Sequence, residues 1–246
     1  MARQPDREVI PVVQKVRLRY AKRGPLKFSS HRDFQRAFER AVRRVGVPMA
    51  YSAGFNPHPK ISYANAASTG TASEAEYVEI GLAKEVGLEQ LVSALQSSMP
   101  NGLDIVEAVN AATPDFVARL EASVWHLAIP GHSSASLAVP IADFLSKHEV
   151  EVSRMTKNGL RTFDARGAVL NLSIQGDEMT ESGLSCAILR LVLRHSTPAV
   201  RPDDVLSALT KDADLAFEVA VRVTRLAQGP LIQDGTNVGD PFDPDR

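Results

Sequence analysis

The stretch QKVRLRYAKRGPLKFSSHRDFQRAFERAVRRV, residues 14–45, decides the fold of the first half of the chain. Its first nine residues alternate apolar and basic side chains, as in a strand with one buried face and one polar face. A Gly-Pro pair then breaks the strand, and Ser30 with Asp33 three positions later is a variant of the capping box that begins helices. We therefore predict a strand at 14–22 and a helix over about 31–45.

The two sides of the predicted helix differ in character. At about 100° per residue, its apolar residues fall on one face, which predicts packing against a sheet. The apolar residues are Phe34, Ala37, Phe38, Ala41 and Val45. A line of arginines falls on the opposite, outward side: Arg32, Arg36, Arg40 and Arg43.

The elements that follow complete a small α+β domain. We predict a strand at 61–64, a loop at 65–75, a strand at 76–83, a helix at 87–98 ended by Pro100, and a strand at 102–109. The order strand-helix-strand-strand-helix-strand predicts a ferredoxin-like sandwich, in which two helices cover one face of an antiparallel sheet.

The second half repeats this order without sequence identity to the first. The predicted elements are a strand at 118–129, a helix at 134–147 that contains Pro140, a hairpin at 150–162 that turns at Asn158-Gly159, strands at 167–175 and 184–195, a helix at 202–210 and a strand at 216–225. We therefore expect an α+β fold of two tandem ferredoxin-like βαββαβ sandwiches with antiparallel sheets. The expected domains are 14–112, with the basic helix and the GFNPHPK loop, and 116–226. Residues 1–13 and the Gly-, Pro-, Asp- and Asn-rich tail 227–246 are expected to be disordered.

Charge is distributed unevenly along a chain whose formal net charge is only −1. Residues 14–60 contain twelve Lys or Arg against two acidic residues, a local charge of +10. Such asymmetry favours a polyanionic partner, because regularly spaced guanidinium groups match the phosphates of a nucleic-acid backbone. The alternative is a solvated helix face. The predicted strand and the residue that follows it add four cations beside the helix: Arg17, Arg19, Lys22 and Arg23.

A second indication of function is the loop at residues 51–60. It combines aromatic, cationic and hydrogen-bonding side chains in a segment stiffened by two prolines: Tyr51, Phe55, Asn56, His58 and Lys60. Aromatic and cationic residues together favour stacking on unpaired bases with phosphate contact. The alternative is a rigid structural turn whose Tyr and Phe belong to the core.

Few residues suit catalysis or metal binding. His31, Asp33 and His58 are the candidate catalytic groups, although they share no recognised ligand spacing, and no metal or cofactor is expected. The single cysteine, Cys186, excludes a disulfide framework, a multi-thiolate zinc site and an iron–sulfur cluster, and suits a reducing cytosol. No apolar run of 18 residues indicates a membrane span, and the first residues do not resemble a signal peptide.

Three segments resemble a known family. Phe28-Ser29-Ser30-His31-Arg32-Asp33, the arginine-rich helix, and Tyr51-Ser52-Ala53-Gly54-Phe55-Asn56-Pro57-His58-Pro59-Lys60-Ile61-Ser62 resemble the radical-SAM-linked family of uncharacterised proteins. The string GFNPHPKIS is the most specific part, and a looser resemblance covers about 15–225. Because one cysteine cannot form a CxxxCxxC cluster, the resemblance implies the stand-alone form without radical chemistry. Stand-alone members tend to be encoded near ribonuclease E/G and ribosomal-protein genes, which implies an RNA-related role but no activity for any single residue.

We expect a cytoplasmic RNA-binding or adaptor protein that acts on tRNA, rRNA or a ribonucleoprotein. The helix arginines would contact phosphates, and the loop would close over a nucleotide. A first alternative is an RNA-modifying enzyme or enzyme subunit, in which His31, Asp33 and His58 converge in a pocket. A second alternative is a docking module for a radical-SAM enzyme or a ribonuclease, in which the arginines pair with carboxylates.

Overall fold

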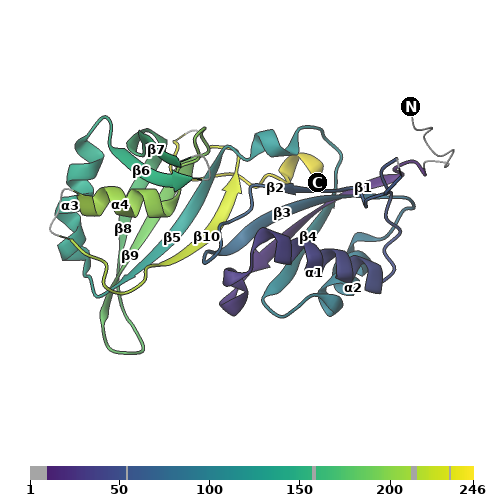
Figure 1. The fold of residues 1–246 in the computed structure, drawn as a ribbon, viewed down its shortest axis with the longest axis horizontal. Helices are drawn as coiled ribbons and strands as arrows, with labels where there is room; N and C mark the ends of the chain where they lie inside the picture. The colour runs from purple at the N-terminus through teal and green to yellow at the C-terminus, as the bar shows by residue number, and fades with distance from the viewer. Residues whose placement is uncertain (1–9, 54, 157–158, 212–214, 233) are drawn as a thin grey trace. The chain divides into compact units, whose positions relative to one another are not determined.

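Residues 10–53, 55–156, 159–211, 215–232 and 234–246 are described by a computed structural model of the chain. The chain divides into two units (Figure 1). The first unit comprises residues 1–118 and 241–246, and the second comprises residues 119–240. The fold is mixed α+β, with antiparallel strand pairing and four α-helices among the described residues.

The first unit is a four-stranded antiparallel arrangement with two helices. Its elements are β1 (Gln14–Lys22), α1 (His31–Arg44), β2 (Ile61–Ala64), β3 (Ala72–Leu82), α2 (Leu88–Ser98) and β4 (Leu103–Asn110). β1 pairs with both β3 and β4, and β2 pairs with β3, so the strand order within this unit is β4-β1-β3-β2. The strand and helix predicted from residues 14–45 are confirmed at β1 and α1.

One face of this sheet forms the core of the first unit. Val16, Leu18 and Tyr20 of β1 are fully or almost fully buried, in one cluster with the apolar face of α1 and with Leu91 and Leu95 of α2. Residues of both helices belong to this one cluster, so α1 and α2 cover the same face of the sheet. The alternation along β1 therefore buries its apolar residues under the helices, as the sequence predicts.

The C-terminal segment covers part of the opposite face of the same sheet. Phe242 is fully buried. The centre of its ring lies 5.3 Å from the centre of the Tyr77 ring and 5.7 Å from the centre of the Phe116 ring. Asp245 is bound to Arg17 and accepts hydrogen bonds from the backbone and side chain of Thr113. The prediction of a disordered tail over 227–246 is therefore wrong for its described residues, because apolar and ionic contacts hold the last of them on the first unit. Within the predicted disordered N-terminus, residues 1–9 lie outside the described residues, whereas the Val13 N–H donates to the Leu82 carbonyl.

The second unit has the same order of elements, with one insertion. Its elements are β5 (Ala122–Pro130), α3 (Ser134–Ser146), β6 (Glu151–Thr156), β7 (Gly159–Asp164), β8 (Val169–Met179), β9 (Ser185–Arg194), α4 (Pro202–Lys211) and β10 (Arg222–Gly229). The strand order is β10-β5-β9-β8, all antiparallel, and β6 and β7 form a separate hairpin. Lys157 and Asn158 of the predicted turn lie outside the described residues.

Several predicted strand bounds need correction. The strand predicted at 118–129 is β5 at Ala122–Pro130, and the strand predicted at 167–175 is β8 at Val169–Met179. Two further cases show the physical reason. β3 begins at Ala72, within the predicted loop 65–75, because Ser73 pairs with Lys22 of β1. The last strand lies at Arg222–Gly229 rather than at 216–225, since it pairs with β5 from Ala128 to Ala122. In both cases pairing with a neighbouring strand decides the bounds, and the local pattern does not.

Candidate functional site

The helix α1 is fixed at its start by a complete capping box. The Ser30 hydroxyl accepts from the Asp33 N–H at 3.2 Å, and the Asp33 carboxylate accepts from the Ser30 N–H at 3.0 Å. Hydrogen bonds from the Ser30 side chain and backbone lower the pKa of Asp33, and the charge of Arg36 lowers it further. The carboxylate of Asp33 is thus engaged at the start of the helix.

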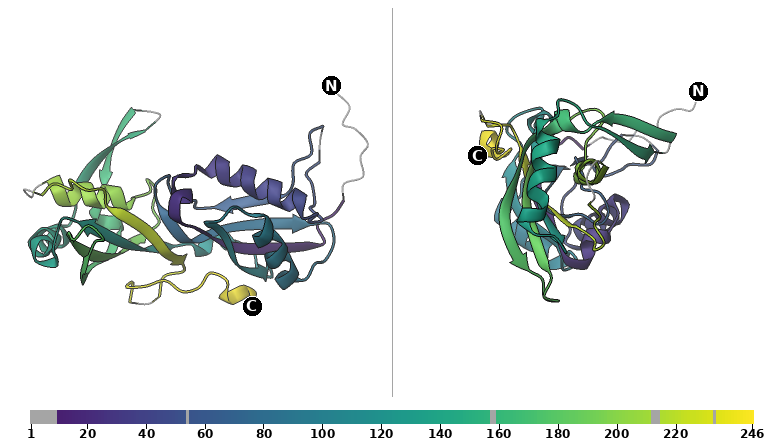
Figure 2. Two further views of the ribbon diagram at one scale, coloured as in Figure 1. Left: turned by 90° about the horizontal axis from the view of Figure 1, so that it is seen from below. Right: turned by 90° about the vertical axis from the view of Figure 1, so that its left-hand side faces the viewer.

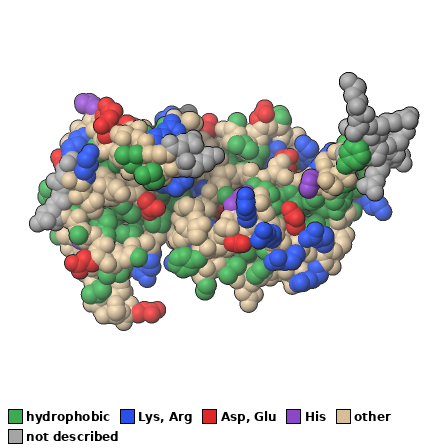
Figure 3. Space-filling view, in the orientation of Figure 1, with side chains coloured by type: hydrophobic (Ala, Val, Ile, Leu, Met, Phe, Trp, Pro, Cys, Tyr) green, Lys and Arg blue, Asp and Glu red, His purple; other side chains and the backbone are tan. Residues whose placement is uncertain are grey.

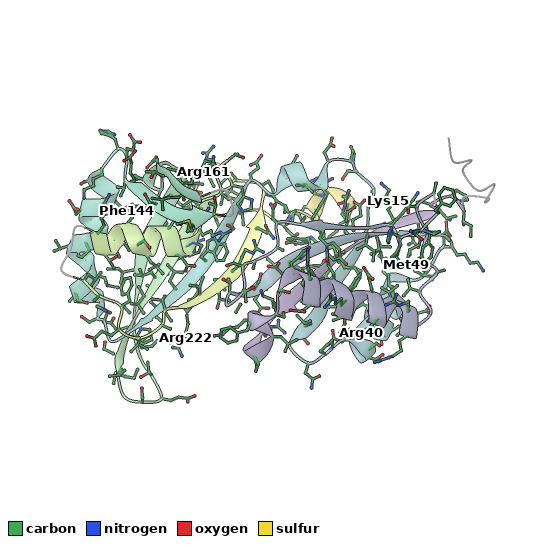
Figure 4. All side chains as sticks on the ribbon, viewed as in Figure 1. Lys15, Arg40, Met49, Phe144, Arg161 and Arg222 are labelled. Atoms are coloured by element: carbon green, nitrogen blue, oxygen red, sulfur yellow. The ribbon has the colours of Figure 1, made fainter. Side chains whose placement is uncertain are left out.

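Burial of the apolar face of α1 forces its arginines outward. Phe34, Ala37, Phe38, Ala41 and Val42 are buried against the sheet. Arg32, Arg36, Arg40 and Arg43 are exposed, and within the described residues none of the four has an ion pair or a side-chain hydrogen bond. Figure 3 shows blue side chains gathered over α1, and Arg40 marks the place in Figure 4. We call these four residues the arginine face.

Arg44 extends this face, although sequence reasoning did not include it in the line. It is exposed, and its guanidinium lies 3.5 Å from the Ser98 hydroxyl at the end of α2. At about 100° per residue it lies roughly 120° from Arg32 around the helix, at the margin of the outward side. Only the structure shows that a residue at this edge of the outward side is exposed to solvent.

The basic residues of β1 are placed differently. Arg17 is 3% exposed and is bound to Glu79, Asp245 and the carbonyl of Thr113. Arg19 pairs with Glu107 at 2.9 Å, and the buried Lys22 donates to the carbonyl of Ser68. This corrects the expectation that the polar side of β1 presents free cations, because carboxylates and carbonyls within the unit already bind them.

Arg23, just beyond β1, is also bound by carboxylates of the first unit. It pairs with Glu74 and with Asp104, and its hydrogen bond to the Glu74 carboxylate raises the pKa of its guanidinium. The structure therefore distinguishes two groups among the twelve cations of residues 14–60. The group on and beside β1 is paired within the unit, while the arginine face is not.

The loop at residues 51–60 is closed by its own hydrogen bonds. The Ser52 N–H donates to the His58 carbonyl at 2.9 Å, and the His58 N–H donates to the Ser52 hydroxyl at 3.0 Å. Tyr51 also forms a strand bridge with Pro59. The exposed side chains of this loop include every predicted contact residue: Tyr51, Phe55, Asn56, His58 and Lys60. Gly54 lies outside the described residues.

Tyr51 and Phe55 are not core residues. Tyr51 is 43% exposed and Phe55 is 64% exposed, which excludes the alternative of a turn whose aromatics fill the core. The Lys60 N–H donates to the Ala50 carbonyl, and the Ala50 N–H donates to Gly81 at the end of β3, so the loop is anchored to the sheet. Figure 2 shows the loop leaving the end of α1 on the helix side of the sheet.

His31, Asp33 and His58 do not converge. The His31 ring packs edge-on against Tyr63 of β2 at 5.0 Å and its Nε2 accepts from the Gln35 amide at 3.0 Å, in the first turn of α1. His58 lies in the loop that follows the other end of the helix. No contact joins the three groups in the described part of the chain, and no cluster of three His, Cys, Asp or Glu that could hold a metal occurs among those residues.

A cavity of about 570 Å³ lies on the face of the first sheet that the helices leave uncovered. Its lining includes Lys15, Arg17, Glu79 and residues 111–118. Each of the three guanidinium nitrogens of Arg17 donates a hydrogen bond to a partner within the unit. Arg17 and Glu79 in this cavity are therefore bound to each other within the unit, and the arginine face and the loop at residues 51–60 are the stronger candidate site.

Comparison with known proteins places most of the chain in one family. Residues 15–202 match the model of a family described as an uncharacterized protein conserved in bacteria (DUF2344). A search of the curated proteins found no match. The matched range includes the arginine face and the loop at residues 51–60. In the described part of the chain, none of the helices combines the length and the apolar character that crossing a membrane requires.

Proposed function

Because the chain belongs to the DUF2344 family of bacterial proteins, we propose on the basis of its candidate site that it is a cytoplasmic RNA-binding or adaptor protein. In this proposal the arginine face contacts the phosphates of an RNA, of the tRNA or rRNA class or in a ribonucleoprotein. The loop at residues 51–60, which follows α1, adds the exposed His58, whereas the Lys60 Cβ lies beside Gly81 and Val12 on the face of the sheet opposite the helices.

The observation that carries the proposal is the contrast between the two groups of cations. Arg17, Arg19 and Arg23 form ion pairs with carboxylates, whereas the four arginines of the arginine face form none among the described residues, and Arg36 acts on Asp33 through its charge alone. Arg32, Arg36 and Arg40 follow one another at four-residue spacing, and like charges at this spacing destabilise a helix by about 0.2–0.5 kcal/mol per pair. A polyanion relieves this repulsion, so the arginine face is better suited to a bound state than to water.

The fold is consistent with this placement. We infer that both units are ferredoxin-like sandwiches in tandem, since each has the element order βαββαβ with the first strand between the fourth and the third. The hairpin β6–β7 is then an insertion in the second unit. Because the helices of such a sandwich pack on one side of the sheet, the side of α1 that faces away from the sheet is exposed to solvent. This exposed side bears the arginines.

The first test is the salt dependence of RNA binding. Replacing Arg36 and Arg40 by alanine removes two phosphate contacts, so we expect weaker binding to RNA of any sequence. The plot of log affinity against log salt concentration should flatten by roughly 1–2 units. Fluorescence anisotropy with a labelled RNA, at several salt concentrations, measures this slope. An unchanged slope would contradict the proposal.

The matched control removes two exposed arginines from the second unit. Arg194 and Arg201 are exposed, and neither side chain makes an ion pair among the described residues. The double variant Arg194→Ala/Arg201→Ala changes the net charge by the same amount and should keep the salt slope. Protein purified at low salt should also carry RNA, which its ratio of absorbance at the nucleic-acid and protein maxima reveals. Protein free of nucleic acid would instead indicate that the arginine face binds an acidic protein.

A further inference from the structure

The exposed aromatic residues of this protein are confined to the two ends of α1. The chain has nine Phe, four Tyr and one Trp, all of which the structure describes. Only three of these fourteen are exposed: Phe28, Tyr51 and Phe55. Phe28 precedes the first turn of α1, and the other two lie in the loop that follows its last turn.

These three rings are large apolar surfaces left in water. Phe28 and Phe55 are each 64% exposed, and the Lys27 ammonium lies 5.1 Å from the centre of the Phe28 ring. Single exposed apolar residues are ordinary on protein surfaces. Here, however, the protein buries or half-buries its other eleven aromatic residues and leaves only the rings that flank the arginine face exposed.

The spacing of these rings suits one class of ligand. With 14 residues at a rise of about 1.5 Å, α1 is about 21 Å long. A stacked strand that advances roughly 3.4 Å per nucleotide would cover this length with about six nucleotides. Its phosphates would follow the arginines, and its end bases would reach the rings.

We propose that the arginine face, Phe28 and the loop at residues 51–60 together bind an unpaired RNA strand, with bases stacked on the aromatic rings at both ends of α1. This inference rests on the proposed function and specifies its ligand. In a duplex each base is covered by its neighbours, so a flanking aromatic ring finds no free base to stack on. In an unpaired strand, stacking on an aromatic side chain strengthens binding without requiring a particular sequence.

The test compares an unpaired strand with a duplex and aromatic variants with arginine variants. Labelled RNA of about twelve nucleotides, within the site sizes of known single-strand binders, is titrated unpaired and annealed to its complement. We expect the protein to prefer the unpaired strand by tenfold or more. Phe28→Leu and Phe55→Leu should each weaken binding to the unpaired strand by about tenfold and leave the salt slope unchanged, because leucine keeps an apolar side chain but cannot stack as a ring does.

A control and the contrary outcomes keep the two proposals separate. Met179→Ala removes an exposed apolar side chain from the second unit and should leave binding unchanged. If the duplex binds as well as the unpaired strand and both Phe variants bind normally, the stacking inference is overturned. The proposed function survives that result if Arg36→Ala/Arg40→Ala still weakens binding. If neither RNA binds, both proposals fail.

Discussion

At the scale of single residues, His195 makes the stability of the second unit depend on pH. Its Nδ1 lies 2.6 Å from the Leu120 carbonyl, and its Nε2 lies 3.1 Å from the Ser123 hydroxyl, which also accepts from the Trp125 indole. Burial lowers the pKa of His195, the hydrogen bond to Leu120 opposes this, and the charge of Arg225 lowers it further. The folded chain therefore holds this imidazole neutral at a pH where the unfolded chain, with a His pKa of about 6.5, already binds a proton.

The sign of the effect follows from this difference in pKa. Above about pH 6.5 both states are neutral at His195 and its contribution to stability is complete. As pH falls below that value the unfolded state gains a proton first, so the free energy of unfolding decreases. We expect His195→Asn to lose this decrease relative to wild type between about pH 7 and 5, as urea unfolding at a series of pH values would show. His148 is exposed in the same unit, and His148→Asn should keep the wild-type dependence. Equal dependence in wild type and His195→Asn would contradict the assignment.

At the scale of elements, the arginines that we propose for RNA binding repel one another along α1 and so reduce the stability of the folded chain. Arg32, Arg36, Arg40 and Arg44 form three consecutive like-charge pairs at four-residue spacing. Arg36→Gln/Arg40→Gln removes all three pairs and keeps helix propensity, so the free energy of unfolding should rise by up to about 1 kcal/mol at low salt. The gain should shrink in high salt because the repulsion is screened.

Two single variants test this interpretation by urea unfolding. Arg19→Gln loses the ion pair with Glu107 and should reduce stability, whereas Arg194→Gln, on the second unit, should change it little. A destabilised Arg36→Gln/Arg40→Gln variant would show that these arginines have stabilising contacts within the folded protein.

The elements also show which features the sequence could predict. The bounds of β1 and α1 follow from local signals, since alternation, a Gly-Pro break and the Ser30/Asp33 capping box each act over a few residues. The start of β3 could not be predicted in this way, because Ala72–Ala75 contains small and polar residues that become a strand only through pairing with β1. The arginine face was predictable because the opposite face of the helix is apolar over its whole length.

At the scale of the whole molecule, contacts between distant parts of the chain explain what sequence reasoning missed. The alternation in β1 identifies Arg17 as polar-facing, but the segment that covers this side of the sheet lies more than 220 residues away, at Asp245. A segment rich in Gly, Pro and Asp also has no periodic pattern of its own, so its order depends on a docking surface that only the folded first unit supplies. Similarly, the exposure of Phe28 follows from packing, and residue type alone favours burial.

The docking of residues 241–246 makes the first unit depend on the end of the chain. Asp245→Asn leaves the buried Arg17 without one of its carboxylate partners, and breaking a buried ion pair costs about 3–5 kcal/mol. Phe242→Ala opens a gap beside Tyr77 and Phe116 with a cost of similar size.

All four tyrosines lie in the first unit, whereas the single tryptophan, Trp125, lies in the second. Near-ultraviolet circular dichroism can therefore follow the two units separately during thermal unfolding. We expect both variants to lower the midpoint of the tyrosine signal more than that of the tryptophan signal. Asp243→Asn, which affects only an exposed pair with Arg246, should leave both midpoints nearly unchanged. An unchanged tyrosine midpoint in Asp245→Asn and Phe242→Ala would show that the first unit does not need its C-terminal segment.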